Sequence, residues 1–224
     1  MRQLILELLP EAPPSLDNFV AGGNGEALTA LAHWLSPDSG EPSFVLWGEA
    51  GAGKSHLLRA SGAAYHDAEA DPTLADMDEE PLFQAVDNVE ALAPEGQIAL
   101  FNRFNRLRAR GGRLLTAAEA PPMQLALRED LRTRLGSGLI YRLQALTDDE
   151  QLAALSAQAE ARGMGLPSDA LHYLVSRAPR DMRSLSALLA ALDRYSLEHK
   201  RPITVPLLRE VLQATPEADR KSVV

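Results

Sequence analysis

The stretch Gly48-Glu49-Ala50-Gly51-Ala52-Gly53-Lys54-Ser55 reads G-x-x-x-x-G-K-S, which is a complete P-loop. The glycines of such a loop let backbone N–H groups turn inward around the α- and β-phosphates of a nucleotide. The Lys54 ammonium can reach the β- and γ-phosphate oxygens, and the Ser55 hydroxyl can ligate Mg²⁺. The residues expected to bind the nucleotide in this region are Gly48, Gly51, Ala52, Gly53, Lys54, Ser55 and His56.

The segments on either side of the loop have the composition that a P-loop requires. Ser43-Phe44-Val45-Leu46-Trp47 is apolar and β-prone, and His56-Leu57-Leu58-Arg59-Ala60 begins a helix. The N-terminal end of such a helix carries partial positive charge, which favours an anion. A glycine-rich turn that matches the pattern by chance is the alternative, and this context argues against it.

The composition favours a soluble globular protein of one or two domains. The chain has 224 residues, of which 46% are hydrophobic and 24% charged. It contains no cysteine, which excludes disulfides and thiol–metal sites. A net charge of −9 argues against a surface that coats DNA broadly. No run is long and apolar enough to span a membrane, and the N-terminus lacks the pattern of a signal peptide, so we expect a cytoplasmic protein.

The first part of the chain, residues 16–146, alternates strand-like and helix-like segments. The expected strands are 44–47, 82–86, 113–116 and 138–143, and the expected helices include 28–35, 56–65 and a segment around 98–107. Residues 67–81 are acidic and poorly patterned, which indicates a loop. Such alternation predicts an α/β domain with a mostly parallel sheet that is covered by helices on both faces.

The second part, residues 147–224, has only helical patterns. Thr147-Asp148-Asp149-Glu150 is a capping-box sequence, and apolar stripes at helical spacing follow it. Thr204-Val205-Pro206 is typical of the beginning of another helix. We therefore expect a small C-terminal all-α lid of about four helices.

A second chemical motif is Val86-Asp87-Asn88-Val89-Glu90. An acidic residue at the end of a strand beside a P-loop can hold Mg²⁺ through its water shell, so Asp87 joins Ser55 as an expected metal ligand and is a candidate catalytic residue. The strongest catalytic version would have Glu directly after the Asp, but Asn88 occupies that position. Glu90 would point elsewhere if the strand continued. The alternative for the motif is a solvated acidic turn.

Two arginines are candidates for a role in phosphoryl transfer. Arg134 precedes the last expected strand, and Arg183 begins the apolar helix after Pro179-Arg180-Asp181-Met182. A guanidinium near a γ-phosphate stabilises the charge of the transition state and can be supplied in trans. The alternative is that both are solvated surface residues, as most arginines are.

Together these segments resemble the DnaA-related AAA+ family, and within it the Hda type of regulator, over nearly the whole chain. The resemblance includes Asp17-Asn18-Phe19-Val20, the P-loop, the Asp-Asn motif, Leu114 to Pro122, and the segments around Arg134 and Arg183. It implies a P-loop AAA+ fold with a five-stranded type of parallel sheet, and it places Phe19 and Val20 beside the adenine. It also implies that Arg134 is an arginine finger and that Arg183 is the sensor 2 arginine. Glu119 stands where the family usually has Asp. The segment between Ser55 and Asp87 is shorter than the family normally has, so a strand and a helix are expected to be reduced or missing.

The N-terminal segment, residues 1–15, resembles the sliding-clamp-binding peptide of the same regulators. Gln3-Leu4-Ile5-Leu6-Glu7-Leu8 matches Q-L-x-L-x-L, which makes Gln3, Leu4, Leu6 and Leu8 the expected clamp-binding residues. Glu7 stands where the regulators usually have proline. The alternative is a strand that packs on its own core or frays.

The resemblance implies a regulator of replication initiation that binds ADP or ATP with Mg²⁺ between its two domains. Its implied partners are DnaA, the sliding clamp, DNA mainly through the clamp, and a second copy of the chain. It would present Arg134 to DnaA-bound ATP, and its own ATPase activity would be weak because of Asn88. Two alternatives remain. A DnaC-like helicase loader is disfavoured by the short segment before Asp17, and a small-molecule kinase is disfavoured by the C-terminal bundle with its sensor-like arginine.

Overall fold

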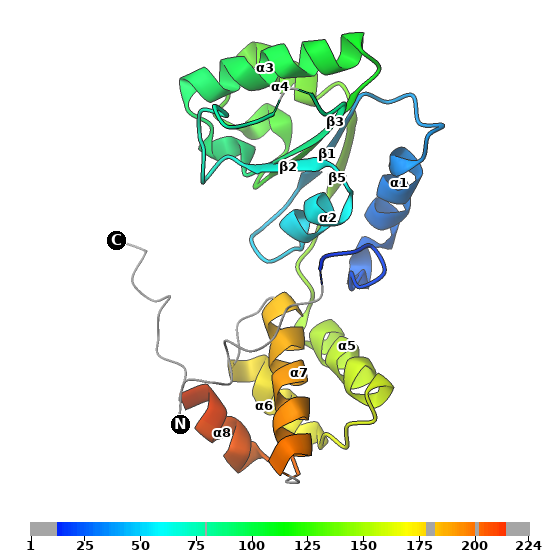
Figure 1. Ribbon diagram of the computed structural model, residues 1–224, viewed down its shortest axis with the longest axis vertical. Coiled ribbons are helices and arrows are strands. Elements are labelled where there is room, and N and C mark those ends of the chain that lie inside the picture. Colours follow the sequence, from blue (N-terminus) through cyan, green and yellow to red (C-terminus); the bar gives the residue numbers. More distant parts are fainter. Residues whose placement is uncertain (1–12, 79, 178–181, 200–201, 214–224) are drawn as a thin grey trace. The chain divides into compact units, whose positions relative to one another are not determined.

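The computed structural model describes residues 13–78, 80–177, 182–199 and 202–213 (Figure 1). These residues form two compact units, 13–145 and the described residues from Leu146 onward. Each unit has hydrophobic clusters of its own, two in the first and two in the second. Gln3, Leu4, Leu6 and Leu8, the expected clamp-binding residues, lie outside the described residues.

The first unit contains a five-stranded parallel sheet. Its strands are β1 (Ser43–Trp47), β2 (Ala64–Asp67), β3 (Phe83–Asp87), β4 (Arg113–Ala118) and β5 (Leu139–Arg142). They are ordered β2-β3-β4-β1-β5, so the strand before the P-loop lies between β4 and β5. All carboxyl ends of a parallel sheet meet at one edge, which is where such folds place their ligands. The predicted fold class is confirmed for this unit.

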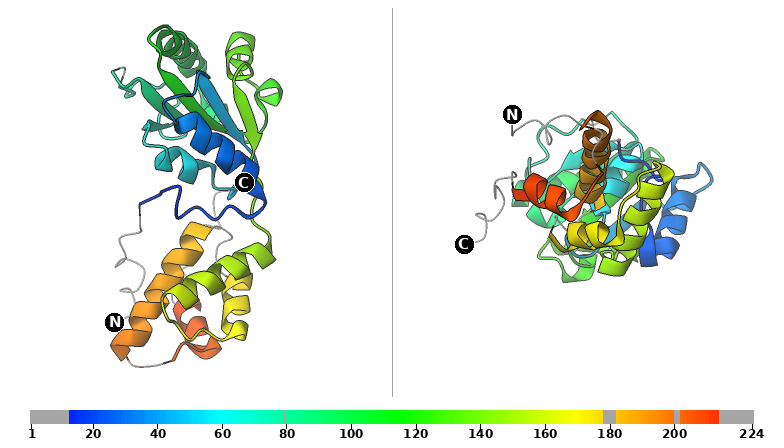
Figure 2. Two further views of the ribbon diagram at one scale, coloured as in Figure 1. Left: turned by 90° about the vertical axis from the view of Figure 1, so that its right-hand side faces the viewer. Right: turned by 90° about the horizontal axis from the view of Figure 1, so that it is seen from below.

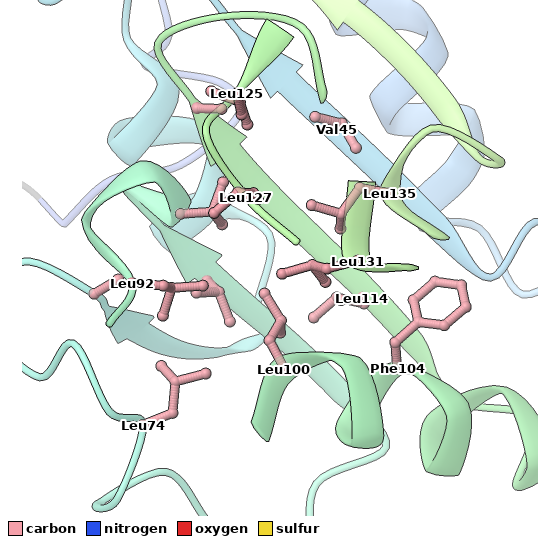
Figure 3. Close-up of a cluster of buried hydrophobic side chains, with 14 of the residues drawn as sticks. Val45, Leu74, Leu92, Leu100, Phe104, Leu114, Leu125, Leu127, Leu131 and Leu135 are labelled. Carbon is pink, nitrogen blue, oxygen red and sulfur yellow. The ribbon is translucent and has the colours of Figure 1, made fainter. Parts of the chain in front are cut away.

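Helices cover both faces of the sheet, because successive strand residues point to opposite sides. Val45 and Leu114 pack with α3 (Pro94–Ala109) and α4 (Glu129–Leu135), and Figure 3 shows this cluster. Phe44 and Leu46 pack on the other face with α1 (Gly25–Leu35) and α2 (Lys54–Ala60). Three short 3-10 helices, Gly22–Asn24, Val89–Ala91 and Pro122–Gln124, complete the unit. The central strands β1, β3 and β4 are thus buried on both faces, as the apolar run before the P-loop predicts.

The region after the P-loop differs from the expectation in two ways. The helix predicted over 56–65 ends at Ala60, because the Ser61 hydroxyl bonds the Leu58 carbonyl and Gly62 has a φ of 77°. Residues 64–67 were not among the expected strands, yet they form the four-residue β2 at the edge of the sheet, so a strand is reduced and not missing. Between β2 and β3 the described residues contain no helix, in agreement with the shortened segment.

Two polar side chains support the helix-free connection between β2 and β3. Gln84 looks like an interruption of strand β3 in sequence, yet it is fully buried and donates to the carbonyls of Asp78 (3.2 Å) and Pro81 (2.8 Å). The buried Arg103 of α3 donates to the carbonyls of Met77 (3.0 Å) and Asp78 and to the Gln84 amide oxygen (3.3 Å). These bonds replace the partners that a helix would have supplied to the backbone.

We expect Arg103→Leu to lower the free energy of unfolding by about 3 kcal/mol, because it leaves the Met77 carbonyl and the Gln84 amide oxygen without these partners in a buried setting. Arg108→Leu, at an exposed position of the same helix, is the matched control and should change stability by less than about 0.5 kcal/mol. Urea unfolding followed by circular dichroism measures both. Equal midpoints for the two variants would contradict the structural role of Arg103.

The second unit is all-α (Figure 2). Its helices are α5 (Asp148–Ala161), α6 (Ser168–Arg177), α7 (Met182–His199) and α8 (Val205–Gln213). The predicted capping box is confirmed: the Glu150 N–H donates to Thr147 Oγ1 at 3.2 Å, and the Thr147 N–H donates to Glu150 Oε2 at 2.9 Å. Throughout the described parts of the chain, no helix has the length and apolar character needed to cross a bilayer.

Candidate functional site

The P-loop lies at the carboxyl edge of the sheet, where its backbone is held by the neighbouring strands. The Gly48 N–H donates to the carbonyl of Ala118 at the end of β4, at 3.1 Å. A Cβ at Gly48 would lie 2.1 Å from the Leu143 carbonyl oxygen, so only glycine fits between the loop and the segment after β5. The beginning of the loop is therefore fixed by non-local contacts.

Gly53 is required for a different reason. It has a φ of 91°, and a Cβ there would lie 2.6 Å from the ring of Phe19. The Phe19 ring also lies 5.6 Å from the His56 ring, and His56 Nε2 is 2.9 Å from the Ser15 carbonyl oxygen. The structure thus brings Phe19, Gly53 and His56 together, with the half-buried Val20 next to Phe19 in the chain.

The loop has the donors that a phosphate group needs. No hydrogen bond within the described residues uses the backbone N–H of Gly51, Gly53, Lys54 or Ser55, whereas the Ala52 N–H bonds the Glu49 carbonyl. Lys54 Nζ donates to the carbonyls of Gly48 (2.6 Å) and Glu49 (3.0 Å), so the ammonium lies against the loop itself. These unpaired donors and the nearby cation fit an anionic ligand.

The surroundings of Lys54 are acidic. Burial lowers the pKa of Lys54, and the negative charges of Glu90, Asp87, Glu119 and Glu49 oppose that shift. Among the described residues, no group of three or more His, Cys, Asp or Glu side chains could hold a metal ion by itself. The expected Mg²⁺ ligands Ser55 and Asp87 would therefore need phosphate oxygens and water to complete a shell.

Asp87 lies at the end of β3, as predicted, and is only 1% exposed. Its Oδ2 accepts from the Tyr65 hydroxyl at 2.8 Å, and Tyr65 in turn accepts from Arg59 Nη2 at 2.9 Å. Burial raises the pKa of Tyr65, and the charge of Asp87 and the hydrogen bond to it act in the same direction, so Tyr65 stays protonated and donates. These hydrogen bonds through Tyr65 of β2 fix the orientation of the Asp87 carboxylate.

Glu90 is the residue near Lys54 whose position sequence reasoning missed. The strand does not continue past Asp87: Asn88 has a φ of 53°, and the 3-10 helix Val89–Ala91 follows. Burial raises the pKa of Glu90, with Glu119 acting in the same direction, whereas backbone N–H groups and Lys54 act to lower it. Asn88 was the one sequence feature that could have indicated this turn, since Asn tolerates the left-handed conformation that ends a strand.

Arg134 lies away from these groups. It projects from α4, with its guanidinium carbon 5.9 Å from the centre of the Phe101 ring of α3. It lines an open hollow together with Phe101, Arg128, Glu129, Asp130 and Thr133. Within the described residues, none of its contacts involves the P-loop. Arg183 belongs to α7 in the second unit.

Comparisons with known proteins agree with this architecture. Residues 148–212 match the family described as Hda, lid domain. Domain III of the Thermotoga maritima replication initiation protein DnaA is 19% identical, with a TM-score of 0.71 over 92% of this chain and 98% of that one. The chain has an AAA+ fold like that of DnaA, and its residues 148–212 match the Hda lid domain.

Two further solved structures have a similar fold. DnaA from Aquifex aeolicus, bound to AMPPCP, is 21% identical, with a TM-score of 0.66 over 83% of this chain and 66% of that one. The Holliday junction branch migration motor RuvB from Thermotoga maritima is 18% identical, with a TM-score of 0.61 over 90% of this chain and 71% of that one. At these identities the likeness concerns the fold, and the roles of individual residues are predictions.

Proposed function

We propose that this protein is an adenine-nucleotide-binding AAA+ regulator that inactivates the replication initiator by stimulating hydrolysis of DnaA-bound ATP. The match of residues 148–212 to the Hda lid domain is the observation that carries this proposal. An AAA+ fold alone would serve many activities, because fold and function are separable. Among the activities that such a fold could serve, the match to the Hda lid domain favours a DnaA-related regulator.

Nucleotide binding by this chain is supported by the unpaired donors of the P-loop and by AMPPCP in the DnaA of similar fold. Gly51, Gly53 and Lys54 would hold the phosphates, and Phe19 and Val20 would lie beside the adenine. Ser55 and Asp87 would hold Mg²⁺, which neutralises phosphate charge. Arg183 would act as the sensor arginine of the lid, and ADP and ATP would compete for the same site.

The trans-acting role is supported by the position of Arg134. Among the described residues its guanidinium has no carboxylate partner, and it contacts an aromatic ring at an open hollow of α3 and α4. Arg128, in the same hollow, instead donates to both carboxylate oxygens of Asp130 at 3.2 and 2.9 Å. Arg134 is therefore available to a phosphate of a neighbouring protein, where a planar guanidinium can bridge two oxygens.

Phosphate release from DnaA-ATP tests this proposal when it is measured with this chain, the sliding clamp and DNA carrying the loaded clamp. We expect stimulation that requires all components together. Rapid turnover by this chain alone on a small acceptor would favour a kinase. Stimulation of a replicative helicase's loading without any effect on DnaA would favour a loader. A second copy of this chain is a further expected partner, and analytical ultracentrifugation with nucleotide tests that expectation.

Docking on the clamp is predicted to depend on Gln3 and Leu4. Gln3→Ala combined with Leu4→Ala should abolish clamp binding, because the peptide loses its polar anchor and an apolar anchor. Ile5→Ala with Glu7→Ala changes the variable positions of Q-L-x-L-x-L and is the matched control. Surface plasmon resonance on immobilised clamp measures binding, and the melting temperature is measured alongside. Normal binding by the Gln3/Leu4 variant would end the assignment, and a large drop in its melting temperature would indicate a structural segment instead.

A further inference from the structure

The chain reverses direction immediately after strand β3. Asp87 is the last residue of the strand, and Asn88 adopts the left-handed conformation with a φ of 53° and a ψ of 48°. The side-chain amide of Asn88 donates to Asp67 Oδ1 at the end of β2, at 2.9 Å. This hydrogen bond stabilises the turn. It also engages the Asn88 side chain, which occupies the position directly after Asp87 where a catalytic glutamate would be expected. The 3-10 helix Val89–Ala91 follows directly, so Glu90 stays near the carboxyl end of β3 and does not continue the line of the strand.

Glu90 lies close enough to the P-loop lysine for their charges to interact. Its charge interacts with those of Lys54 and Glu119, and the backbone N–H of Glu119, which directly follows β4, favours its charged form. Its second oxygen, Oε2, is buried and has no hydrogen-bond partner within the described residues. An unpaired buried carboxylate oxygen is costly, so it is a group to which a bound water or ligand would be expected to donate.

The other carboxylates of this region are less suited to orient a water. Both oxygens of Asp87 are engaged, Oδ2 by Tyr65 and Oδ1 by the Asn88 N–H at 3.1 Å. The Glu119 side chain is exposed, and water would compete for it. Asn88 carries an amide, which cannot accept a proton at neutral pH.

We propose that Glu90 is the carboxylate that orients the attacking water at the γ-phosphate of a nucleoside triphosphate bound in this chain's own P-loop. This inference rests on the nucleotide binding of the proposed function. It replaces the expectation that Asn88 leaves the chain without a catalytic carboxylate. Position 88 lacks a carboxylate, and in this proposal Glu90, three residues after Asp87, supplies it because the chain turns at Asn88.

The step balances with water and the triphosphate as the only reactants. The water oxygen forms a bond to the γ-phosphorus, and the bond from that phosphorus to the β–γ bridging oxygen breaks. The bridging oxygen leaves with the electron pair as part of the diphosphate. Glu90 accepts the proton that the water loses and then returns it to phosphate or solvent. Lys54 supplies positive charge beside the oxygens on which negative charge grows.

Glu90→Gln tests this inference by binding as well as by turnover. Removing a negative charge near the γ-phosphate should tighten binding of a non-hydrolysable ATP analogue by about 3- to 10-fold and leave ADP affinity nearly unchanged. Hydrolysis in a single-turnover assay should fall by at least about 100-fold. Glu90→Asp should recover part of the hydrolysis. Glu95→Gln makes the same change at an exposed position of α3 and should behave as the parent protein.

The outcomes separate this inference from the proposed function. If the parent protein binds no nucleotide, the proposed function fails first. If the parent binds nucleotide but hydrolyses none in a single turnover, Glu90 has no such role. The inference is also wrong if Glu90→Gln binds and hydrolyses as the parent does. Loss of ADP binding along with hydrolysis would make Glu90 a structural support of the loop, which would overturn its assignment as a water-orienting residue.

Discussion

Arg134→Ala should fold normally and bind nucleotide and clamp normally, yet lose about 1,000-fold of its stimulation of DnaA-ATP hydrolysis. The fold should survive because the Arg134 guanidinium makes only a ring contact with Phe101 among the described residues, and such contacts contribute about 0.5–1 kcal/mol. The catalytic loss should be large because the guanidinium would act only on the transition state. The measurement is phosphate release from DnaA-ATP in the presence of DNA-loaded clamp.

Two further variants make the Arg134 prediction specific. Arg134→Lys should restore little stimulation, because a compact ammonium cannot bridge two phosphate oxygens as the planar guanidinium does. Arg128→Ala removes a guanidinium from the same hollow, but one that is already paired with Asp130, so its effect should be much milder. The trans-acting mechanism is wrong for this protein if both Arg134 variants stimulate as well as the parent chain.

Lys54→Ala should abolish or greatly weaken the binding of ADP and ATP. The β-phosphate would lose the cation that the P-loop supplies, and backbone N–H groups cannot replace a full charge. The surrounding carboxylates make the loss more severe, since Glu90, Asp87 and Glu119 would then face the phosphates without Lys54 between them and the anion. Isothermal titration calorimetry measures the affinity directly.

Proton uptake on nucleotide binding is a second test of the role of Lys54. Burial lowers the pKa of Lys54 in the free protein, whereas a bound phosphate favours the charged ammonium and raises that pKa again. Between the two pKa values, nucleotide binding should therefore take up a proton, and Lys54→Ala should not show this uptake. Calorimetry in buffers of different ionisation enthalpy detects it. Lys200→Ala, the same change at another lysine, should retain both affinity and proton uptake; unchanged affinity in Lys54→Ala would mean that the loop is not the nucleotide site.

Much of the fold could be predicted from local sequence. The apolar run before the P-loop forms β1, the helix after it begins at Lys54, and Asp87 ends a strand. The capping box at Thr147 starts α5 as predicted. These features depend on residues close together in the chain, where spacing and side-chain type determine backbone conformation directly. The same local information placed the P-loop and Asp87 at one edge of a parallel sheet.

Other features were decided only by the tertiary structure. Strand β2 has no clear apolar pattern and forms because β3 offers it a ladder of hydrogen bonds. Gln84 looks disruptive in sequence and becomes a buried support only when it meets Arg103 of α3, which lies 19 residues further along the chain. Phe19 reaches Gly53, and Asn24 bonds the backbone of Gln144 at 2.9 and 2.8 Å, across 120 residues.

Sequence alone determined the P-loop motif of this protein, its α/β class and its helical lid, because each depends on short-range patterns. The charge interaction of Glu90 with Lys54 and the contact of Arg134 with the Phe101 ring were decided by tertiary structure. The physical reason is that non-local contacts, at the ends of strands and between packed helices, bring together segments that are distant in the sequence. A single left-handed residue, Asn88, ends the line of strand β3 and begins the turn that carries Glu90.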